Sequence, residues 1–288
     1  MQAIGVKGFV VVAGVLGLSA VANAADVGMP APAYKAEPAP TTDRQWTVTV
    51  GAYVFTEADY AGSDDYEFAI RPLFSISRAD RLSEFDSFKD NPSIALWDNG
   101  AFELGIVGGL EWKRDAGDSP DLRGLKDIDY AYLVGGYAQW YPVEWLRLRG
   151  ELMYGFGGFD GVVGNLAADA IYFSESLGGI TLSAGPRMTL ASSGYIDTYF
   201  GITPAEAAVA QALGNNVTAY EAGGGVYSVG FGGQISKRFT KNITGSIFGE
   251  YEYLLDDAAD SPIVAQSGDR NQFQAGVSLS YTFFLGFE

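Results

Sequence analysis

The sequence has 288 residues, a formal net charge of −17, and neither cysteine nor histidine. The missing thiols and imidazoles exclude disulfide frameworks, thiolate or histidine metal sites, and catalysis by Cys–His or Ser–His pairs. The acidic balance argues against nucleic-acid binding, because phosphates are bound by Lys and Arg. A charged fraction of 18% with 38 Gly, 17 Tyr and 18 Phe indicates a membrane or all-β protein. We expect no catalytic residues, no cofactor and no metal site.

Residues 1–24 have the pattern of a secretory signal peptide. Lys7 precedes an apolar run over residues 8–18, which is too short to span a bilayer. Small residues at Ala22 and Ala24 predict cleavage before Ala25. The alternative is an uncleaved N-terminal membrane anchor.

Residues 25–44 are rich in Pro and Ala and can neither pair in a sheet nor pack a core. We expect a disordered, extended tether in the periplasm. Contact with a periplasmic partner or the cell wall is the functional alternative to a plain tail. The remainder, residues 45–288, is expected to form a single outer-membrane β-barrel.

From Gln45 onward apolar and polar residues alternate, as in strands with one apolar face. The last strand is the clearest, because Phe273, Val277 and Tyr281 share one face and polar residues share the other. Its length matches the ~10 residues of a transmembrane strand. The alternation predicts about twelve strands, at 45–55, 66–77, 92–98, 101–112, 129–141, 144–156, 162–173, 179–190, 194–200, 225–238, 243–254 and 272–283.

Aromatic residues crowd the strand ends, as in the girdles of membrane barrels. Examples are Trp97, Trp112, Trp140, Trp145 and Phe283. A soluble β-sandwich also alternates, but a closed barrel is the sheet that leaves no unpaired edge in lipid. We therefore predict an all-β, antiparallel transmembrane barrel in the outer membrane of a Gram-negative bacterium. Its surroundings would be outer-membrane lipid and lipopolysaccharide.

The polar faces carry charges of both signs, which a barrel would point into its interior. The candidates are Glu67, Arg71, Glu103, Glu111, Arg147, Arg149, Glu151, Arg187, Arg238, Glu250 and Glu252. In a narrow interior these groups would pair across strands and fill the space, whereas in a wide, wet one they would select solutes by charge. The strand number falls short of the ~16–18 that give porins an aqueous channel, which favours the filled interior.

The termini of such a barrel normally lie in the periplasm, so odd-numbered connections would face outside. These are 56–65, 98–100, 142–143, 174–178, 201–223 and 255–270. Segments 78–91 and 113–128 would then be long periplasmic turns, although such turns are usually short. A further strand at 81–88 would reverse the sidedness of the connections that follow it.

Two connections have features of their own. Thr203, Pro204 and Glu206 predict a short helix over 203–213, begun by a capping box and ended by Gly214. Aspartates cluster in 56–65 and 255–270 without the spacing of an EF-hand, so we expect a solvated acidic surface rather than a cation site.

The segment 251–264, YEYLLDDAADSPIV, resembles a signature of the MipA/OmpV family of outer-membrane proteins. The matching signature residues are Asp260, Ser261, Pro262, Ile263 and Val264. Weaker similarities lie at Tyr60–Ser63 with Pro72, Gly185–Pro186, Tyr195–Gly201 and Tyr281–Phe283, and together they span residues 45–284. The resemblance implies a barrel that scaffolds cell-wall enzymes and links a murein lytic transglycosylase to a murein synthase.

Three functions remain open at this stage. The first is the non-enzymatic scaffold that the resemblance implies. The second is a small, porin-like channel for ions or small solutes, suggested by the charged inner face. The third is a barrel enzyme using the pair Glu250 and Glu252, which two positions along a strand would separate by ~7 Å, within the range of inverting glycosidases. We expect no enzyme, because a narrow barrel interior filled by its own side chains would not admit a glycan.

Overall fold

The computed structural model describes residues 45–78 and 85–286, which form one antiparallel sheet of eleven strands. The strands are β1 (Gln45–Ala58), β2 (Tyr66–Arg78), β3 (Ser93–Asp98), β4 (Phe102–Glu111), β5 (Ala131–Val143), β6 (Leu146–Gly157), β7 (Gly161–Ser174), β8 (Ile180–Ala191), β9 (Gly225–Arg238), β10 (Ile243–Leu254) and β11 (Asn271–Gly286). The helices are α1 (Ser193–Phe200), α2 (Pro204–Ala212), α3 (Asp256–Asp260) and α4 (Pro262–Ala265), with a 3₁₀ turn at Pro120–Leu122. The expected signal peptide with its cleavage at Ala24 and Ala25, and the expected tether 25–44, lie outside the described residues.

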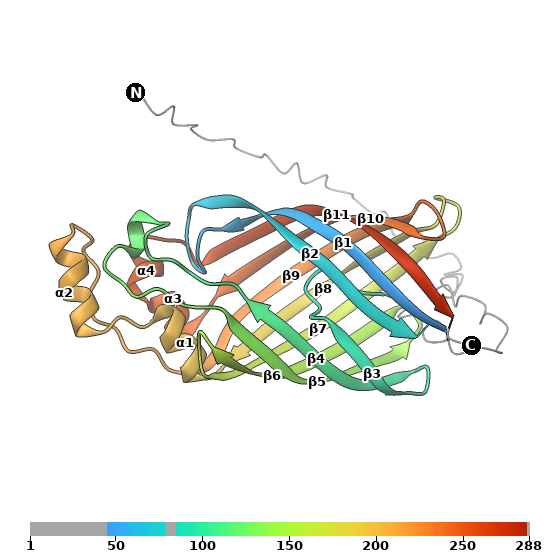
Figure 1. Cartoon of the computed structure of the whole chain (residues 1–288), viewed down its shortest axis with the longest axis horizontal. Coiled ribbons are helices and arrows are strands. Elements are labelled where there is room, and N and C mark those ends of the chain that lie inside the picture. The colour runs from blue at the N-terminus through green and yellow to red at the C-terminus, as the bar shows by residue number, and fades with distance from the viewer. Residues whose placement is uncertain (1–44, 79–84, 287–288) are drawn as a thin grey trace, which may run out of the picture. The chain divides into compact units, whose positions relative to one another are not determined.

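The sheet curls so that its first and last strands are neighbours. β1 pairs with β11 from Gln45 opposite Gly286 onward, and the strand order runs from β2 through β1 and β11 down to β3. The edge strands β2 and β3 approach each other across a seam, and no ladder joins them in the described sheet. There the guanidinium carbon of Arg71 in β2 lies 4.8 Å from the ring centre of Trp112, which follows β4. The architecture is the predicted all-β barrel (Figure 1). No helix in the described ranges is long and apolar enough to cross a membrane.

The odd strand number has a geometric consequence at the seam. Every neighbouring pair from β2 round to β3 is antiparallel, and ten such steps leave β2 and β3 running in the same direction. β2 and β3 therefore cannot be joined by a short turn at one end of the barrel. The described part of this connection, residues 85–92, contacts inner faces of several strands and forms no strand of its own.

The alternation follows the predicted faces. Outward side chains are strongly exposed, with Phe68 at 81% and Leu152 at 63% of their free surface. Aromatic side chains pair near the strand ends. At the outer end, Tyr251 contacts Phe273 and Tyr132 contacts Phe156. Such exposed apolar surface suits a hydrocarbon solvent, because in water a soluble domain rarely exposes so large an apolar face.

The strand predicted at 194–200 is wrong, because these residues form helix α1. Tyr195, Ile196, Tyr199 and Phe200 are buried together on its inner side. Their spacing places them on one helical face, while the alternating Tyr195 and Tyr199 also fit a strand. A short apolar run of this kind is ambiguous by periodicity alone, and tertiary packing decides it.

The sidedness predicted for several connections is also wrong. The segment 113–128 lies at the same end as α1 and α2, because Arg114 donates to the carbonyl of Tyr199 at 2.7 Å and the Lys126 amide donates to Glu206 at 3.0 Å. The loop 59–65 joins them through a bridge between Ser63 and Gly268. The short connections near 98–101, 144–145 and 175–179 lie at the opposite end, with Gln45 and Gly286.

The cause of the error is the connection between β2 and β3. Its described part, residues 85–92, lies in the interior and adds no strand, and the segment 194–200, wrongly counted as a strand, then restores the original alternation of ends. Apart from the interior residues 85–92, the long connections among the described residues thus gather at one end, which Figure 1 shows with its helices. Long loops are typical of the outer face of a bacterial barrel, and short turns of the periplasmic face.

Helix α2 begins as predicted. The Thr203 hydroxyl accepts from the Glu206 amide while the Glu206 carboxylate accepts from the Thr203 amide, which completes the capping box. Pro204 occupies the first turn, and Gly214 follows the helix with a positive φ of 86°.

Candidate functional site in the barrel interior

The interior of the barrel is crossed by residues 85–91, which we call the interior segment. Its Phe88 ring stacks on Phe248 of β10, with 3.8 Å between ring centres and 15° between planes. Tyr53 and Phe55 of β1 meet the same ring edge-on at 5.1 and 5.3 Å. The Phe88 amide also donates to Gln234 of β9 at 3.0 Å. Aromatic packing and a wall hydrogen bond thus hold the segment against one side of the barrel.

The opposite wall holds the segment by charge. Arg147 of β6, whose side chain is fully buried, forms two bonds to Asp90, from Nη1 at 2.5 Å and from Nη2 at 3.1 Å. The same guanidinium donates from Nε at 3.0 Å and Nη2 at 2.6 Å to Asp169 of β7, which is also fully buried. Arg147 therefore joins the interior segment to the wall through two carboxylates at once.

Neighbouring charges extend this contact into a cluster. Arg149 lies 2.8 Å from Glu151 on the same strand and 3.7 Å from Asp90, and Arg187 of β8 lies 2.5 Å from the second oxygen of Asp169. The charge cluster comprises Asp90, Arg147, Arg149, Glu151, Asp169 and Arg187. It is neutral as a set, with three cations and three anions. Buried charges are stable only when paired and hydrogen-bonded in this manner.

The interior segment also binds the cluster through its polar side chains. Arg187 donates to the Ser87 hydroxyl at 3.3 Å, and Asn91 donates to Glu151 at 2.8 Å. Of the residues predicted to line the interior, the structure therefore brings Arg147, Arg149, Glu151 and Arg187 together.

The other predicted interior charges lie in smaller groups. Lys89 of the interior segment lies 3.7 Å from Glu252 of β10, which also accepts from Ser228, and Glu250 is two positions away on the same face. Arg71 pairs with Glu57 at 2.5 Å near the seam, and Glu103 accepts from Tyr137 at 2.5 Å. Glu111 takes the inner face at the end of β4, opposite Ala131. Glu67 is exposed at the outer end of β2, and Arg238 is exposed at the periplasmic end of β9.

Two members of the charge cluster were missed by the sequence analysis. Asp169 occupies an inner-face position of a strand that was predicted, so alternation alone could have found it. Asp90 carried no comparable signal, since it lies in a connection with no periodicity and its partner Arg147 is 57 residues away.

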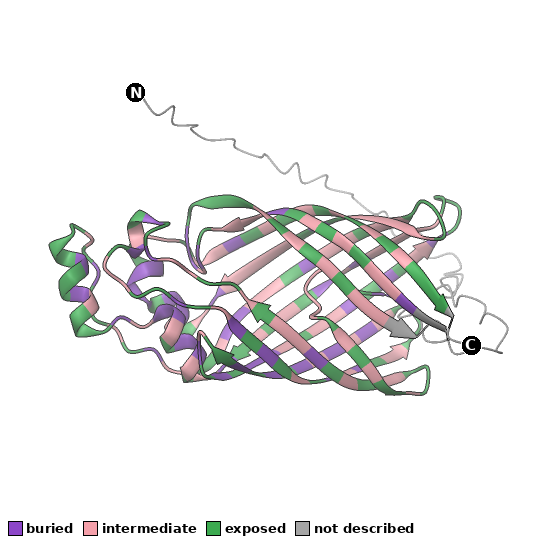
Figure 2. Cartoon of the chain, in the orientation of Figure 1, coloured by how far each residue is buried: buried purple, intermediate pink, exposed green. Residues whose placement is uncertain are grey.

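The outer end is closed by the family-like signature 260–264. Ser261 is fully buried and donates to the carbonyl of Phe200 in α1 at 2.6 Å. Tyr60 donates to the carbonyl of Ile263 at 3.1 Å, and Ile263 and Val264 are buried. Asp260 lies on the surface, 3.9 Å from Arg270. Figure 2 shows buried positions gathered in these helices at the outer end.

One glycine fits this closure. Gly62 has φ of 96°, where L residues are strained, and a Cβ there would collide with Val264. The signature residues thus pack between α1 and the β1–β2 loop. We call this packed region at the outer end the lid.

A cluster of carboxylates lies outside the lid. One oxygen each of Asp64, Asp65 and Asp121 lies within 4.8 Å of the others, and two of the three residues are exposed. Burial, followed by repulsion from Asp64 and Asp65, raises the pKa of Asp121 above its ordinary value. The structure thus adds Asp121, from the segment 113–128, to two of the aspartates that the sequence analysis noted in 56–65.

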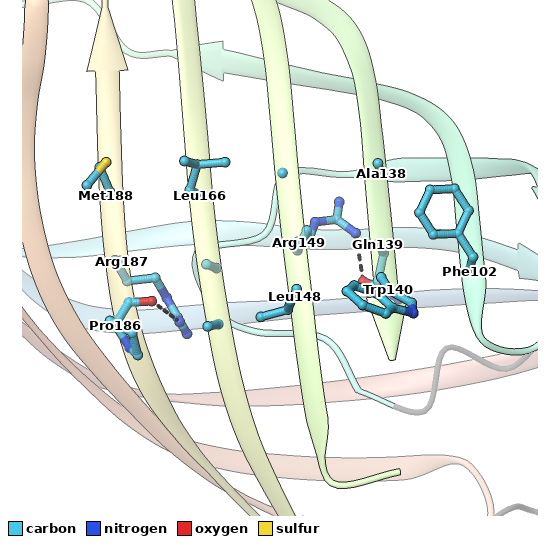
Figure 3. Close-up of a pocket in the computed structure, with 13 residues that line it drawn as sticks. Phe102, Ala138, Gln139, Trp140, Leu148, Arg149, Leu166, Pro186, Arg187 and Met188 are labelled. Atoms are coloured by element: carbon cyan, nitrogen blue, oxygen red, sulfur yellow. Dashed lines mark hydrogen bonds between the residues drawn. The ribbon is translucent and has the colours of Figure 1, made fainter. Parts of the chain in front are cut away.

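The lipid-facing surface over β4–β8 carries a shallow apolar groove of about 470 Å³, shown in Figure 3. Phe102, Trp140, Leu148, Leu166 and Met188 line it from outward positions. Arg149 and Gln139 belong to the same strands, one position along, and Arg149 donates to Gln139 at 3.2 Å. One layer of wall therefore separates the charge cluster from the bilayer face.

A protein-family model described as MltA-interacting protein MipA matches residues 50–283. The chain belongs to the MipA family. As a MipA-family protein it is an outer-membrane β-barrel of a Gram-negative bacterium, and neither the family nor the barrel is a typical enzyme framework. No curated protein matches the sequence significantly.

Solved structures similar to this MipA-family chain are also outer-membrane barrels. An outer membrane channel from Pseudomonas putida F1 has 11% identity over 87% of this chain and 99% of its own, with a TM-score of 0.44. OprG from Pseudomonas aeruginosa has 6% identity over 84% and 97%, with a TM-score of 0.28. The N-terminal barrel domain of OprF from the same species has 12% identity over 64% and 98%, with a TM-score of 0.26.

Proposed function

We propose that this protein is a non-enzymatic outer-membrane barrel that acts as a docking partner for a murein lytic transglycosylase, and through it for a murein synthase. The family description, MltA-interacting protein, supports the first partner. The observation that carries the proposal is the occupied interior, where the interior segment spans from Phe248 on one wall to Arg147 on the other. A barrel filled in this way offers its rims and tether for function rather than its lumen.

The docking surface is at the periplasmic end. The segment 113–128, which the sequence placed there, lies at the outer end and takes no part in the proposal. The remaining periplasmic features are the short turns and the expected tether 25–44. Leu177, in the turn between β7 and β8, is 56% exposed.

The proposal is tested by photo-crosslinking in cells. A benzoylphenylalanine at Tyr34 in the tether or at Leu177 should crosslink to the lytic transglycosylase, detected with an antibody. The matched control is Leu213, which is 59% exposed at the outer end and should give no such product. Equal amounts of crosslinked product from Leu213 would contradict the proposal. If deletion of residues 25–44 left binding of every partner unchanged, the tether would have no part in docking.

A small channel is the second candidate, and the charge cluster is the observation that favours it. Single-channel conductance of the refolded protein in a planar bilayer separates the two functions. The docking proposal expects a folded, silent barrel. Discrete conductance steps, shifted in ion selectivity by Arg147→Ala or Arg149→Ala, would favour the channel.

A further inference from the structure

The charge cluster has two parts: five residues on the barrel wall, and Asp90 from the interior segment. Arg147, Arg149, Glu151, Asp169 and Arg187 all project from strands β6, β7 and β8. Asp90 alone comes from the interior segment. The wall by itself has three cations and two anions, so its neutrality depends on a carboxylate that the wall does not supply.

That carboxylate is held in the manner of a ligand. Arg147 presents two parallel N–H groups to the two oxygens of Asp90, which is the fork geometry that guanidinium offers to carboxylates. The Ser87 amide donates to the same carboxylate at 2.8 Å, and Arg149 lies 3.7 Å away. The fork is built beforehand, because Asp169 fixes the other edge of the Arg147 guanidinium.

The interior segment has other anchors that do not use Asp90. Phe88 packs against Phe248, Tyr53 and Phe55, and Lys89 lies near Glu252. Removing the Asp90 carboxylate alone would therefore leave the segment packed while exposing the fork with an unbalanced positive charge.

We propose that the Arg147–Arg149 pair is a binding site for small carboxylate anions, and that the side chain of Asp90 occupies it as an intramolecular ligand. A tethered ligand competes at an effective concentration in the millimolar range or above. The wild-type site is therefore closed to dilute carboxylates, and it accepts one only when Asp90 is removed or outcompeted.

The first experiment is anion rescue of Asp90→Ala in detergent micelles. Thermal unfolding is measured in sodium formate, sodium chloride and sodium phosphate at equal ionic strength. Asp90→Ala should unfold at a lower temperature than wild type in chloride. Formate should raise the unfolding temperature of Asp90→Ala, and the rise should grow with the logarithm of the formate concentration above its Kd, because a ligand of the folded state stabilises it by RT ln(1 + [L]/Kd). Wild type should show no difference between formate and chloride.

The matched control is the double variant Asp90→Ala/Arg147→Met. It lacks both the Asp90 carboxylate and the Arg147 guanidinium, and its unfolding temperature should not respond to formate. Equal responses of Asp90→Ala to formate and chloride would overturn the proposal, as would an equal formate response of the double variant. A larger response to phosphate than to formate would overturn the assignment to carboxylates.

A second variant covers the case in which Asp90→Ala does not fold. Asp90→Ser shortens the side chain and removes its charge while keeping a polar hydroxyl, and fluoroacetate binding to it can be followed by ¹⁹F line broadening. We expect broadening with Asp90→Ser that exceeds both wild type and Asp90→Ser/Arg147→Met. Identical line widths for all three proteins would refute the site.

Discussion

Replacing Arg147 by methionine tests whether the charge cluster holds the barrel interior together. The substitution keeps much of the apolar stem but removes six hydrogen bonds: two to Asp90, two to Asp169, and one each to the Phe85 carbonyl and the Gln139 side chain. Breaking a buried ion pair by removing one partner costs about 3–5 kcal/mol, since the other charge stays buried. Asp169 keeps Arg187 at 2.5 Å and Asp90 keeps Arg149 at 3.7 Å. We therefore expect the free energy of unfolding to fall by about 3 kcal/mol, at the lower end of that range.

The assay is reversible urea unfolding in detergent micelles, followed by the fluorescence of the five tryptophans. Arg238→Met is the matched control, because Arg238 is exposed at the end of β9 and should change stability by no more than about 0.5 kcal/mol. Arg147→Lys should fall between the two, because an ammonium cannot form the fork. A loss for Arg147→Met no greater than that for Arg238→Met would refute the reasoning that the cluster is buried and structural.

Three further outcomes are expected. Phe88→Ala should lower the free energy of unfolding by about 2 kcal/mol through lost packing on Phe248, while Phe239→Ala, at an exposed ring, should leave it nearly unchanged; urea unfolding measures both. Thr203→Ala should destabilise helix α2 by about 1 kcal/mol, seen as faster amide hydrogen exchange over Pro204–Ala212 and not in β11. The pKa of Asp121 is raised in the folded state, by burial first and then by Asp64 and Asp65, so its ionisation costs stability as pH rises above the ordinary value of 3.8. Asp121→Asn should therefore raise the urea midpoint relative to wild type at pH 7, and the gain should vanish below that value; an equal gain at both pH values would contradict the titration.

The strand faces could be predicted from the sequence because a two-residue period is a local property. Phe273, Val277 and Tyr281 need no distant information to be placed on one side of β11. Helix α1 shows where this signal fails. The spacing of Tyr195 and Tyr199 fits both the two-residue period of a strand and the 3.6-residue period of a helix, and only the packing against Phe159 and Tyr227 selects the helix.

The bulge before Ser228 shows a second limit. The register between β8 and β9 shifts at Thr189 and Leu190, so Tyr227 turns toward Tyr195 and Phe200 instead of the lipid face that strict alternation would give it. An extra residue in one strand leaves no mark in its own composition.

The candidate site was half predictable for the same reason. Arg147, Arg149, Glu151 and Arg187 lie on inner faces that alternation identifies. Their partner Asp90 lies in the interior segment, whose contacts reach residues 57 to 163 positions later in the sequence. No local pattern in the interior segment encodes those partners.

The interior segment precedes in the chain nearly all of the wall that surrounds it. Its partners on β6, β8, β9 and β10 are synthesised after it, and the β1–β11 ladder that joins the first and last strands comes later still. A loop that enters a finished barrel would have to thread through its mouth. Here the later strands follow the segment in the chain and can form their contacts with residues 85–91 while the sheet closes. Loss of the Phe88 and Asp90 contacts should therefore slow closure of the sheet as well as loosen the finished barrel.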